Sequence, residues 1–374
     1  MKIKLFAILT VLLSLTLSAA EEKAPLPPAP DVTPVEKYTP PTLSDENSWT
    51  MVVIPDTQAY VSRRRNQGAL DMMFSWIAEN VNRMKIQQVV QLGDMVDVSQ
   101  QLVTGKDGTY QSGAEQWAAI SRTFERLDNV VPYVLCTGNH DYGWRSAENR
   151  SCNLDKFFPT GRNDKWKNVL VGMGQNAFGQ LTLENAAYEF TTPNGQKILI
   201  VSLNFAPTDA NLAWAKSIFS NKKYKNHFGI IVTHSYLNSQ KNGGRIEKES
   251  YQLNKDGGNV GEAIFQKLVK DTPNIRMVLC GHIAAPNDWN ACVNYQVSTN
   301  SAGKKVHEVL FDPQAMAGGW GGNGGDGFIR LMEFDKDMKT VKVKTFSPVF
   351  AYSPSTQHLA WHTAPFNEFV IELD

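Results

Sequence analysis

The sequence predicts a layered α/β fold, and three observations support that prediction. Short apolar runs alternate with longer patterns of helical spacing, as in proteins that pack helices against a sheet. Strand-like patterns dominate the stretch from about residue 306 to residue 346. Apolar residues make up 42% and charged residues 20% of the 374 residues, a balance typical of packed globular proteins. We therefore expect one large domain with no internal linker between residues 49 and 350.

The first half is expected to alternate strands with helices. The apolar run at 50–55 has the length of a strand, whereas Leu70, Met73 and Ile77 recur on one face of a helix. In chain order, the patterns predict a strand at 50–55, a helix at 67–84, a strand at 88–92, a helix at 114–127 and a strand at 132–136.

The second half is expected to begin with a β-hairpin. Asn194 and Gly195 form a turn pair that joins the strands at 187–191 and 197–203. Asp209 can cap the helix that follows, which extends to about residue 220. The remaining patterns predict a strand at 228–232, a helix at 260–270, a strand at 275–279 and further strands within 306–346.

A glycine-rich stretch at 318–327 interrupts the last strands. It lacks the Gly-Lys-Ser/Thr ending of a phosphate-binding P-loop. A mobile surface loop is the favoured interpretation, and a loop that covers a site is the alternative.

The chain is expected to begin with a secretory signal peptide at residues 1–20. Lys2 and Lys4 precede an apolar run that is short for a membrane span, and small residues follow it. An uncleaved N-terminal anchor is the alternative. The predicted organisation is a signal peptide at 1–20, a Pro-rich linker at 21–48, a folded domain at 49–350 and a C-terminal extension packed on it at 351–374. The mature chain is expected to be exported, to the periplasm or the extracellular space.

Charge and cysteine content narrow the class of protein. The chain carries 37 basic and 37 acidic residues, so charge predicts no nucleic-acid binding. No segment after the signal peptide is apolar enough to cross a bilayer, so we expect no membrane span in the mature form. Cys136 and Cys280 each end an apolar run, which favours buried free thiols, and a bridge from Cys280 to Cys292 is the alternative.

Metal-capable residues follow five strand-like runs. In open α/β sheets, ligands bind beyond the carboxyl ends of the strands, so we expect these residues to converge on one site. They are Asp56 and Gln58 after 51–55, Asp94 and Asp97 after 89–92, Asn139, His140 and Asp141 after 133–137, His234 after 230–233, and His282 after 277–280.

The chemistry of these side chains suits divalent metals. Carboxylate, amide and imidazole ligands together favour Mn, Fe or Zn, and Asp94 has two oxygens that can bridge two ions. Two ions about 4 Å apart can clamp a phosphate and generate hydroxide at neutral pH. A lone Asp after a strand is more often a turn residue or a helix cap, and a lone His is more often a hydrogen-bonded core residue. The block GDMVD followed by GNHD is far more specific than either residue alone.

This order of motifs resembles the calcineurin-like metallophosphoesterase superfamily, which shows D-x-H, GDxxD, GNH[DE], a lone His and GHxH. The resemblance covers about residues 50–350 and implies a four-layer α/β/β/α sandwich with a two-metal centre between strand ends. It implies metal ligands at Asp56, Gln58, Asp94, Asn139, His234 and His282. It also implies that His140 acts as a general acid and that Asp141 holds its imidazole, whereas Asp97 supports the loop. PDTQAY and DPQ resemble a secreted branch in which D-x-Q replaces D-x-H.

Two departures from the family pattern affect the first metal position. Gln58 stands where the family has His, and Ala284 stands where the second His of GHxH would be. The protein ligands of the first metal then reduce to Asp56, Asp94 and the Gln58 amide oxygen, with Asn287 or Asp288 open as substitutes. The implied cofactors are one or two divalent ions (Mn, Fe, Zn, Mg or Ca), one tight and one loose, the loose position favouring Mn²⁺, Mg²⁺ or Ca²⁺.

The leading hypothesis is an exported hydrolase of phosphate ester bonds. A metal-activated hydroxide would attack a phosphomonoester or a phosphodiester. The alternative is a degenerate module that binds metal or phosphate with little or no turnover.

Two weaker hypotheses concern other side chains. Trp289, Trp320, Tyr352 and Trp361 could stack on cell-surface sugars, although core packing is the favoured interpretation. Residues 63–65, three consecutive arginines, could bind an anionic substrate, although a solvated basic loop is slightly favoured.

Overall fold

Three parallel strands from the first half of the chain lie side by side in one sheet. They are β1 (Trp49–Ile54), β2 (Ile86–Gln91) and β3 (Tyr133–Val134), in that spatial order. The computed structural model describes residues 37–103 and 110–373. Every residue of β1 is buried, as expected of a strand that is covered on both faces.

The other side of this sheet comes from the end of the chain. β11 (Ile329–Phe334) lies antiparallel to β1, and β12 (Thr340–Phe346) lies antiparallel to β11. β13 (Trp361–His362) and β14 (Glu368–Glu372) both pair with β12. Strands from the predicted extension at 351–374 therefore form part of the sheet.

A second sheet contains seven strands in the order β4-β5-β6-β7-β8-β10-β9. Within it, β6, β7, β8 and β10 are parallel, and Gly195 turns the predicted hairpin between β5 and β6 with a φ of 90°. The strands are β4 (Leu170–Gln175), β5 (Leu181–Thr191), β6 (Lys197–Ser202), β7 (Phe228–Val232), β8 (Ile275–Cys280), β9 (Val293–Thr299) and β10 (Lys305–Phe311).

The helices follow the predicted pattern, with differences at their ends. Those described are α1 (Gln58–Val61), α2 (Gln67–Asn80), α3 (Gly113–Phe124), α4 (Leu154–Phe157), α5 (Asp209–Phe219), α6 (Gln252–Lys255), α7 (Gly261–Ile264) and α8 (Pro348–Ala351). The predicted helix at 260–270 is α7 continued by a π-helix, Phe265–Val269. Thr208, not Asp209, caps α5, because its side chain accepts a hydrogen bond from the Asn211 amide.

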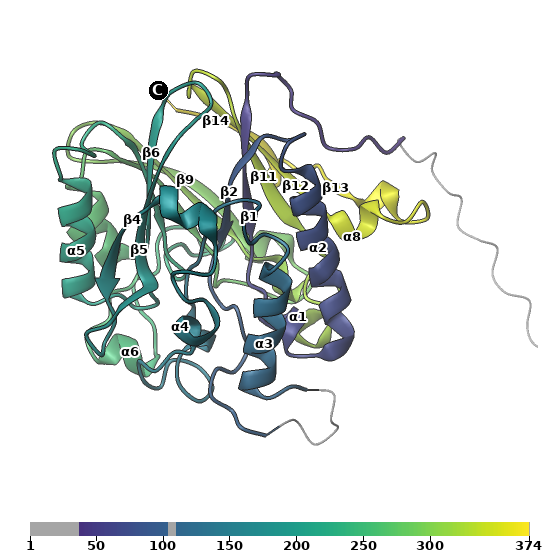
Figure 1. The fold of residues 1–374 in the computed structure, drawn as a ribbon, viewed down its shortest axis with the longest axis horizontal. Helices are drawn as coiled ribbons and strands as arrows, with labels where there is room; N and C mark the ends of the chain where they lie inside the picture. The colour runs from purple at the N-terminus through teal and green to yellow at the C-terminus, as the bar shows by residue number, and fades with distance from the viewer. Residues whose placement is uncertain (1–36, 104–109, 374) are drawn as a thin grey trace, which may run out of the picture. The chain divides into compact units, whose positions relative to one another are not determined.

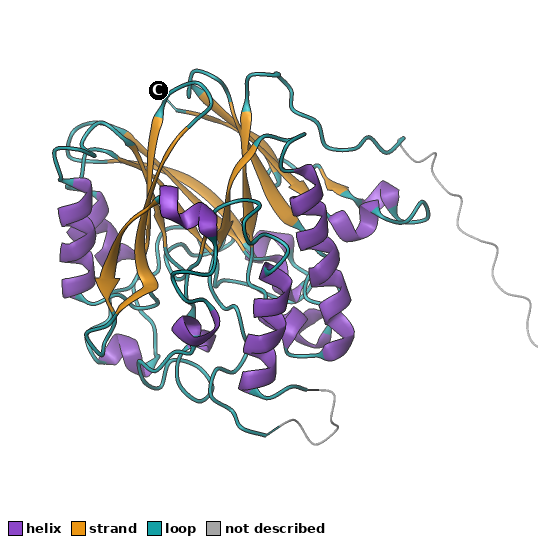
Figure 2. Ribbon diagram, viewed as in Figure 1, coloured by secondary structure: helices purple, strands orange, loops and turns teal. Residues whose placement is uncertain are grey.

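Alternating side chains of the second sheet show how the layers pack. Ile198 and Ile200 of β6 join a core shared with the first sheet and with α2 and α3. Leu199 and Val201 point the other way, into a core shared with α5 and α7. Figures 1 and 2 show the resulting order of helices, sheet, sheet and helices. The predicted α/β/β/α sandwich is therefore confirmed.

Part of the predicted linker at 21–48 packs on the sandwich. The Ser44 side chain donates to Glu333 Oε1 at 2.6 Å, and Trp361 Nε1 donates to the carbonyl of Thr39 at 2.9 Å. The predicted signal peptide lies outside the described residues. Within residues 37–103 and 110–373, none of the helices has both the length and the hydropathy needed to span a membrane. All four cysteines carry free thiols, and Cys152 alone among them is not fully buried.

Candidate metal centre

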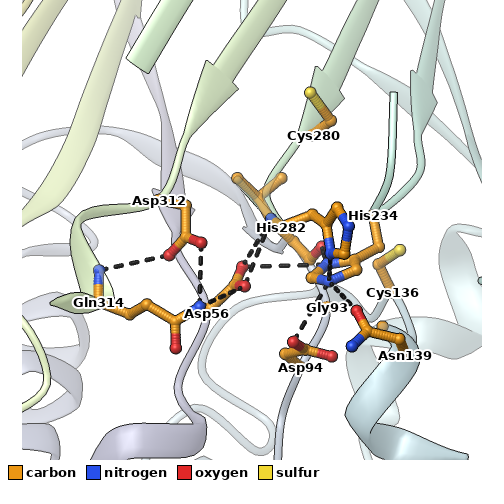
Figure 3. A network of polar contacts seen from close by, with 12 residues as sticks. Asp56, Gly93, Asp94, Cys136, Asn139, His234, Cys280, His282, Asp312 and Gln314 are labelled. Atoms are coloured by element: carbon orange, nitrogen blue, oxygen red, sulfur yellow. Dashed lines mark hydrogen bonds and ion pairs between the residues drawn. The ribbon is translucent and has the colours of Figure 1, made fainter. Parts of the chain in front are cut away.

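Five strand ends bring metal-capable side chains together between the two sheets (Figure 3). Asp56, Asp94 and Asn139 follow β1, β2 and β3 of the first sheet, whereas His234 and His282 follow β7 and β8 of the second. One ligand atom from each of Asp56, Asp94 and His234 lies within 4.8 Å of the other two. The structure thus brings these side chains to one place, as their positions after the strands predict.

His234 Nε2 lies at the centre of a group of donor atoms. Asn139 Oδ1 is 3.1 Å from it, His282 Nδ1 is 3.2 Å from it, and Asp94 Oδ2 is 3.4 Å from it. Two imidazole nitrogens that face each other at this distance need a proton or a cation between them. Two nitrogen and two oxygen donors form a set that suits Zn, Mn or Fe.

The outward nitrogens of both histidines have hydrogen-bond acceptors. His234 Nδ1 lies 2.9 Å from the carbonyl oxygen of Leu92, and His282 Nε2 lies 2.6 Å from Glu249 Oε1. A proton on each outward nitrogen leaves the lone pair of each inward nitrogen free. This arrangement is typical of metal-binding histidines, whose rings are oriented by a carbonyl or a carboxylate. The side chains present therefore fit a divalent cation.

Charge in the cluster also favours a cation. Burial raises the pKa of Asp94, but the neighbouring His234 and His140 outweigh it and hold that pKa at about 2. Burial lowers the pKa of His234, but Asp94 outweighs it and raises that pKa to about 9. Burial, Asp312 and Asp94 raise the pKa of Asp56 well above its usual range. The neighbouring carboxylates, which contribute to both of these last two shifts, also attract a metal ion.

The backbone at two of these residues adopts the left-handed region. Asp94 has a φ of 49° and His282 has a φ of 79°. Residues other than glycine rarely adopt such backbone angles, and residues with strained backbones cluster at functional sites. The left-handed backbone at both strand ends therefore sets the direction in which each side chain leaves its strand.

Two glycines let neighbouring strand ends approach closely. A Cβ on Gly138 would lie 2.1 Å from Asp94 Oδ1, and a Cβ on Gly281 would lie 2.3 Å from Asp56 Oδ1. No side chain fits at either distance. The glycines of the GNHD and GH motifs thus make room for carboxylates that come from other strands.

Gly138→Ala is expected to weaken metal binding without altering any ligand atom. The added methyl group must displace Asp94, which costs about 1–3 kcal/mol of stability by overpacking. Metal titration and thermal unfolding of the metal-free chain test this expectation. Gly68→Ala, where the described residues leave open space around the new methyl group, is the control. Unchanged affinity and melting temperature for Gly138→Ala would contradict it.

His140 lies at the edge of the cluster and is held by its neighbours. Its backbone amide donates to Asp94 Oδ1 at 2.9 Å, and its Nδ1 lies 2.7 Å from the carbonyl oxygen of Asp97. Its side chain is 28% exposed. Burial lowers the pKa of His140, but Asp94 and Asp97 outweigh burial and raise it. The imidazole is thus oriented, partly accessible and biased towards its protonated form.

The structure gives the Asp141 carboxylate other partners than the predicted imidazole. It accepts hydrogen bonds from the amides of Gly138, Val96 and Met95 at 2.7, 3.1 and 3.2 Å. Asp141 therefore ties the loop after β3 to the loop after β2. The expectation that it holds His140 is corrected, because the backbone carbonyl of Asp97 takes that place.

The first metal position contains two residues that sequence reasoning did not assign. Gln314 Nε2 donates to Asp56 Oδ2 at 3.1 Å and to Asp312 Oδ2 at 3.0 Å. Gln58 is buried beside this group and lines a cavity with Gln314. The side chain of Ala284 is a methyl group, which has no donor atom for a metal, and it packs against the core.

The proposed substitutes for the missing histidine have other partners. Asn287 Oδ1 accepts a hydrogen bond from the Gly318 amide at 3.1 Å. Asp288 Oδ1 accepts one from the Asn290 amide at 3.0 Å, and its other oxygen faces Lys241. Both therefore support the loop after β8.

A cavity of about 380 Å³ opens beside His140. It is lined by Gln58, Ala59, Ser62, Arg63, Asp97, His140, Gln314 and Trp320. The glycine-rich stretch contributes Trp320, whose side chain is 54% exposed. The favoured prediction for this stretch was a mobile surface loop, but the structure places it at the mouth of the site.

The arginines at 63–65 hold this loop in place. Arg63 Nη1 donates to the Trp320 carbonyl at 3.5 Å, and Arg65 Nη2 donates to the Gly321 carbonyl at 3.0 Å. Arg64 instead pairs with Glu115 at 2.6 Å. The interpretation as a solvated basic loop is therefore incomplete, because two guanidinium groups bind backbone next to the cavity.

The model of the calcineurin-like phosphoesterase family matches residues 50–286, more than half of the chain. The chain belongs to this family. Calcineurin-like phosphoesterases generally hydrolyse phosphate esters with divalent metals, so family membership and the cluster of Asp56, Asp94 and His234 together support a metal-dependent phosphoesterase.

A sequence relative and a solved structure are similar to this calcineurin-like phosphoesterase. The uncharacterized protein YvnB of Bacillus subtilis (strain 168) is 28% identical over 307 residues, which are 81% of this chain. The chain spans about a fifth of the length of YvnB, since the match covers 20% of that protein. A solved structure, GAP50, the anchor in the inner membrane complex of Plasmodium, has a TM-score of 0.40 and 13% identity, and the match covers 86% of this chain and 90% of that one.

Proposed function

We propose that this calcineurin-like phosphoesterase is an exported enzyme that hydrolyses phosphomonoesters or phosphodiesters. One observation carries the proposal. His234 and His282 face each other with free inward nitrogens beside Asp94 and Asn139, and His140 stands next to them at the cavity. A buried cation-binding cluster and an accessible proton donor are the two parts that hydrolysis of a phosphate ester needs.

The residues of the chain have separable roles in this mechanism. A divalent cation bound here would neutralise phosphate charge and lower the pKa of a water molecule. Asp94, Asn139, His234 and His282 would hold it, and the pKa of Asp94 at about 2 keeps that carboxylate anionic. His140 gives the proton on its Nε2 to the leaving oxygen, since its Nδ1 is bound to the Asp97 carbonyl.

Export is part of the proposal and has its own support. Residues 1–20 have the charge and apolar pattern of a signal peptide, and prolines crowd residues 21–48. We expect a mature chain that begins near residue 21, with a folded domain from about residue 49. Mass spectrometry of chain recovered from outside the producing cell tests this part. Recovery of the uncleaved chain with membranes would instead support an N-terminal anchor.

A second candidate is a module that binds a metal without turnover. Gln58 and Ala284 favour it, because both stand where the family pattern has a histidine. It predicts that metal binding persists and that phosphate esters are not hydrolysed. The retention of His140 beside the cavity favours the enzyme over this module.

Hydrolysis of an aryl phosphomonoester and an aryl phosphodiester tests the enzyme directly. The mature chain is stripped of metal and resupplied with Mn²⁺, Mg²⁺, Ca²⁺ or Zn²⁺, and bound metal is measured in the same samples. Turnover that needs metal and disappears in Asp94→Asn and His140→Ala supports the proposal, and the faster ester identifies the substrate type. Bound metal without turnover under every condition would favour the binding module.

Trp320 is expected to bind the leaving group of the substrate. Its indole lines the cavity beside His140, and stacking of a ring on an aromatic side chain contributes about 0.5–1.5 kcal/mol. Trp320→Ala should therefore raise KM for aryl esters about 2- to 12-fold and leave KM for short alkyl phosphates nearly unchanged. Trp144→Ala is the control, because Trp144 is 47% exposed but does not line this cavity. An equal loss for aryl and alkyl esters would contradict stacking.

A further inference from the structure

The Asp56 side of the centre contains a buried pair of carboxylates joined by an amide. Asp56 Oδ2 and Asp312 Oδ2 both accept hydrogen bonds from Gln314 Nε2, and Figure 3 shows this side chain beside the two carboxylates. Asp56 and Asp312 are 0% exposed, and Gln314 is 2% exposed. The amide is therefore fixed against Asp56, with its oxygen directed away from the atoms that it already contacts.

Two amide oxygens at this position have no hydrogen-bond partner among the described residues. They are Gln314 Oε1 and Gln58 Oε1, and each atom is buried. Buried carbonyl oxygens without a partner are uncommon, and an ion that completes them is one explanation. The two residues lie on different strand ends yet line the same cavity. A cation bound in this cavity beside Asp56 would have both oxygens among its available donors.

Three buried carboxylates make a cation the favoured ligand at this position. Asp56, Asp94 and Asp312 are all buried, and the contacts of Asp56 to positively charged groups are limited to His234 Nδ1 at 3.9 Å within the described part of the chain. Buried carboxylates that are paired with each other need a counter-charge.

We propose that Gln58 and Gln314 replace the two missing histidines with amide oxygens and complete an oxygen-only cation position at Asp56. Asp312 is a positioning residue here, because it holds the Gln314 amide through Nε2 and through the backbone amide of Gln314 at 3.3 Å. This position takes hard divalent cations such as Mn²⁺, Mg²⁺ or Ca²⁺ and disfavours Zn²⁺. The histidine side of the cluster keeps its nitrogen donors. The inference rests on the proposed function for its site but concerns cation choice alone.

Metal titration of the stripped, full mature chain tests this inference. Calorimetry with Mn²⁺ should resolve a tight and a weak class of site, and Zn²⁺ should fill the tight class only. Gln314→Ala should weaken the second Mn²⁺ class about 10- to 100-fold and leave the tight class unchanged. Gln240→Ala, an exposed glutamine outside the cluster, should bind both classes as the parent chain does.

Gln58→His tests the inference by a gain of Zn²⁺ binding rather than by a loss of Mn²⁺ binding. A histidine nitrogen restored at this position should let Zn²⁺ occupy the weak class with affinity raised at least about 10-fold. This variant also keeps the inference testable if Gln314→Ala fails to fold, which melting of the metal-free chain would reveal. Parent-like binding of both metals by a folded Gln314→Ala and by Gln58→His would overturn the inference.

The outcome for cation choice is separable from the outcome for turnover. Two classes of bound Mn²⁺ without hydrolysis of any ester would support the inference and count against the enzyme. Hydrolysis by a chain that binds one metal ion only, at saturating Mn²⁺, would support the enzyme and overturn the inference.

Discussion

Asp94→Asn is expected to abolish turnover and to lower the amount of bound metal. Asp94 Oδ1 accepts the His140 amide at 2.9 Å, and its Oδ2 faces His234 Nε2 at 3.4 Å. The pKa of Asp94, held at about 2, shows that the surroundings favour its charged form. An amide of equal size removes that charge and places a donor beside a metal-binding nitrogen. Loss of several kcal/mol of metal-dependent stabilisation corresponds to a fall in kcat/KM on the order of 10³-fold.

Bound metal and turnover should be measured in the same samples of Asp94→Asn and of a control variant. Asp71→Asn is the matched control, because Asp71 is a partly exposed carboxylate that pairs with Arg126 away from the cluster. The control should bind metal and turn over as the parent chain does. Full metal content together with parent-like turnover in Asp94→Asn would show that Asp94 is not a metal ligand.

Local patterns were sufficient to predict a layered α/β fold and the residues that follow its parallel strands. Asp56, Asp94, Asn139, His234 and His282 each stand directly after a buried apolar run, and such a run marks a strand whatever its partners are. The ends of parallel strands lie at one edge of a sheet, so position after a strand predicts position in the site. The alternation of the two patterns predicted a layered α/β fold, whereas the four-layer sandwich was predicted from the family resemblance.

The sequence did not predict the roles of Gln314, Asp312 and Glu249, because their contacts join segments that are far apart in the chain. Gln314 contacts Asp56 across 258 positions of sequence. Asp312 also follows a strand, β10. Its place in the site depends on the parallel pairing of β10 with β8, which the local sequence does not show. Glu249 lies in an irregular stretch between β7 and α6, where no periodicity marks its approach to His282.

The role expected of Asp141 shows a different limit of sequence reasoning. A carboxylate next to His140 in the chain is an obvious partner for its imidazole. The strand-to-helix turn instead directs Asp141 towards three backbone amides, and a backbone carbonyl holds the ring. Any residue type supplies a carbonyl, so the identity of Asp97 carried no signal for this contact.

His140→Ala is expected to lower kcat about 10²- to 10⁴-fold while both classes of bound metal remain. The ring is an accessible proton donor beside the cluster, and the contact of His140 to Asp94 uses its backbone amide, which alanine retains. Activity loss with retained metal therefore separates proton transfer from metal binding. Partial recovery with leaving groups of low pKa, which need no proton, would identify the step that the ring serves.

Asp141→Asn provides the contrast that separates the two residues. It replaces an acceptor oxygen with an amide donor in a group bound to three backbone amides, so we expect a lower melting temperature and weakened metal binding, because the Asp94 loop loosens. Asp97→Asn keeps the carbonyl that holds His140 and should reduce kcat far less than His140→Ala does. If Asp141→Asn instead lowered kcat as much as His140→Ala, with unchanged metal affinity and melting temperature, the role in orienting the imidazole would return to Asp141. The three variants together therefore decide whether the imidazole is held by a carboxylate or by the backbone.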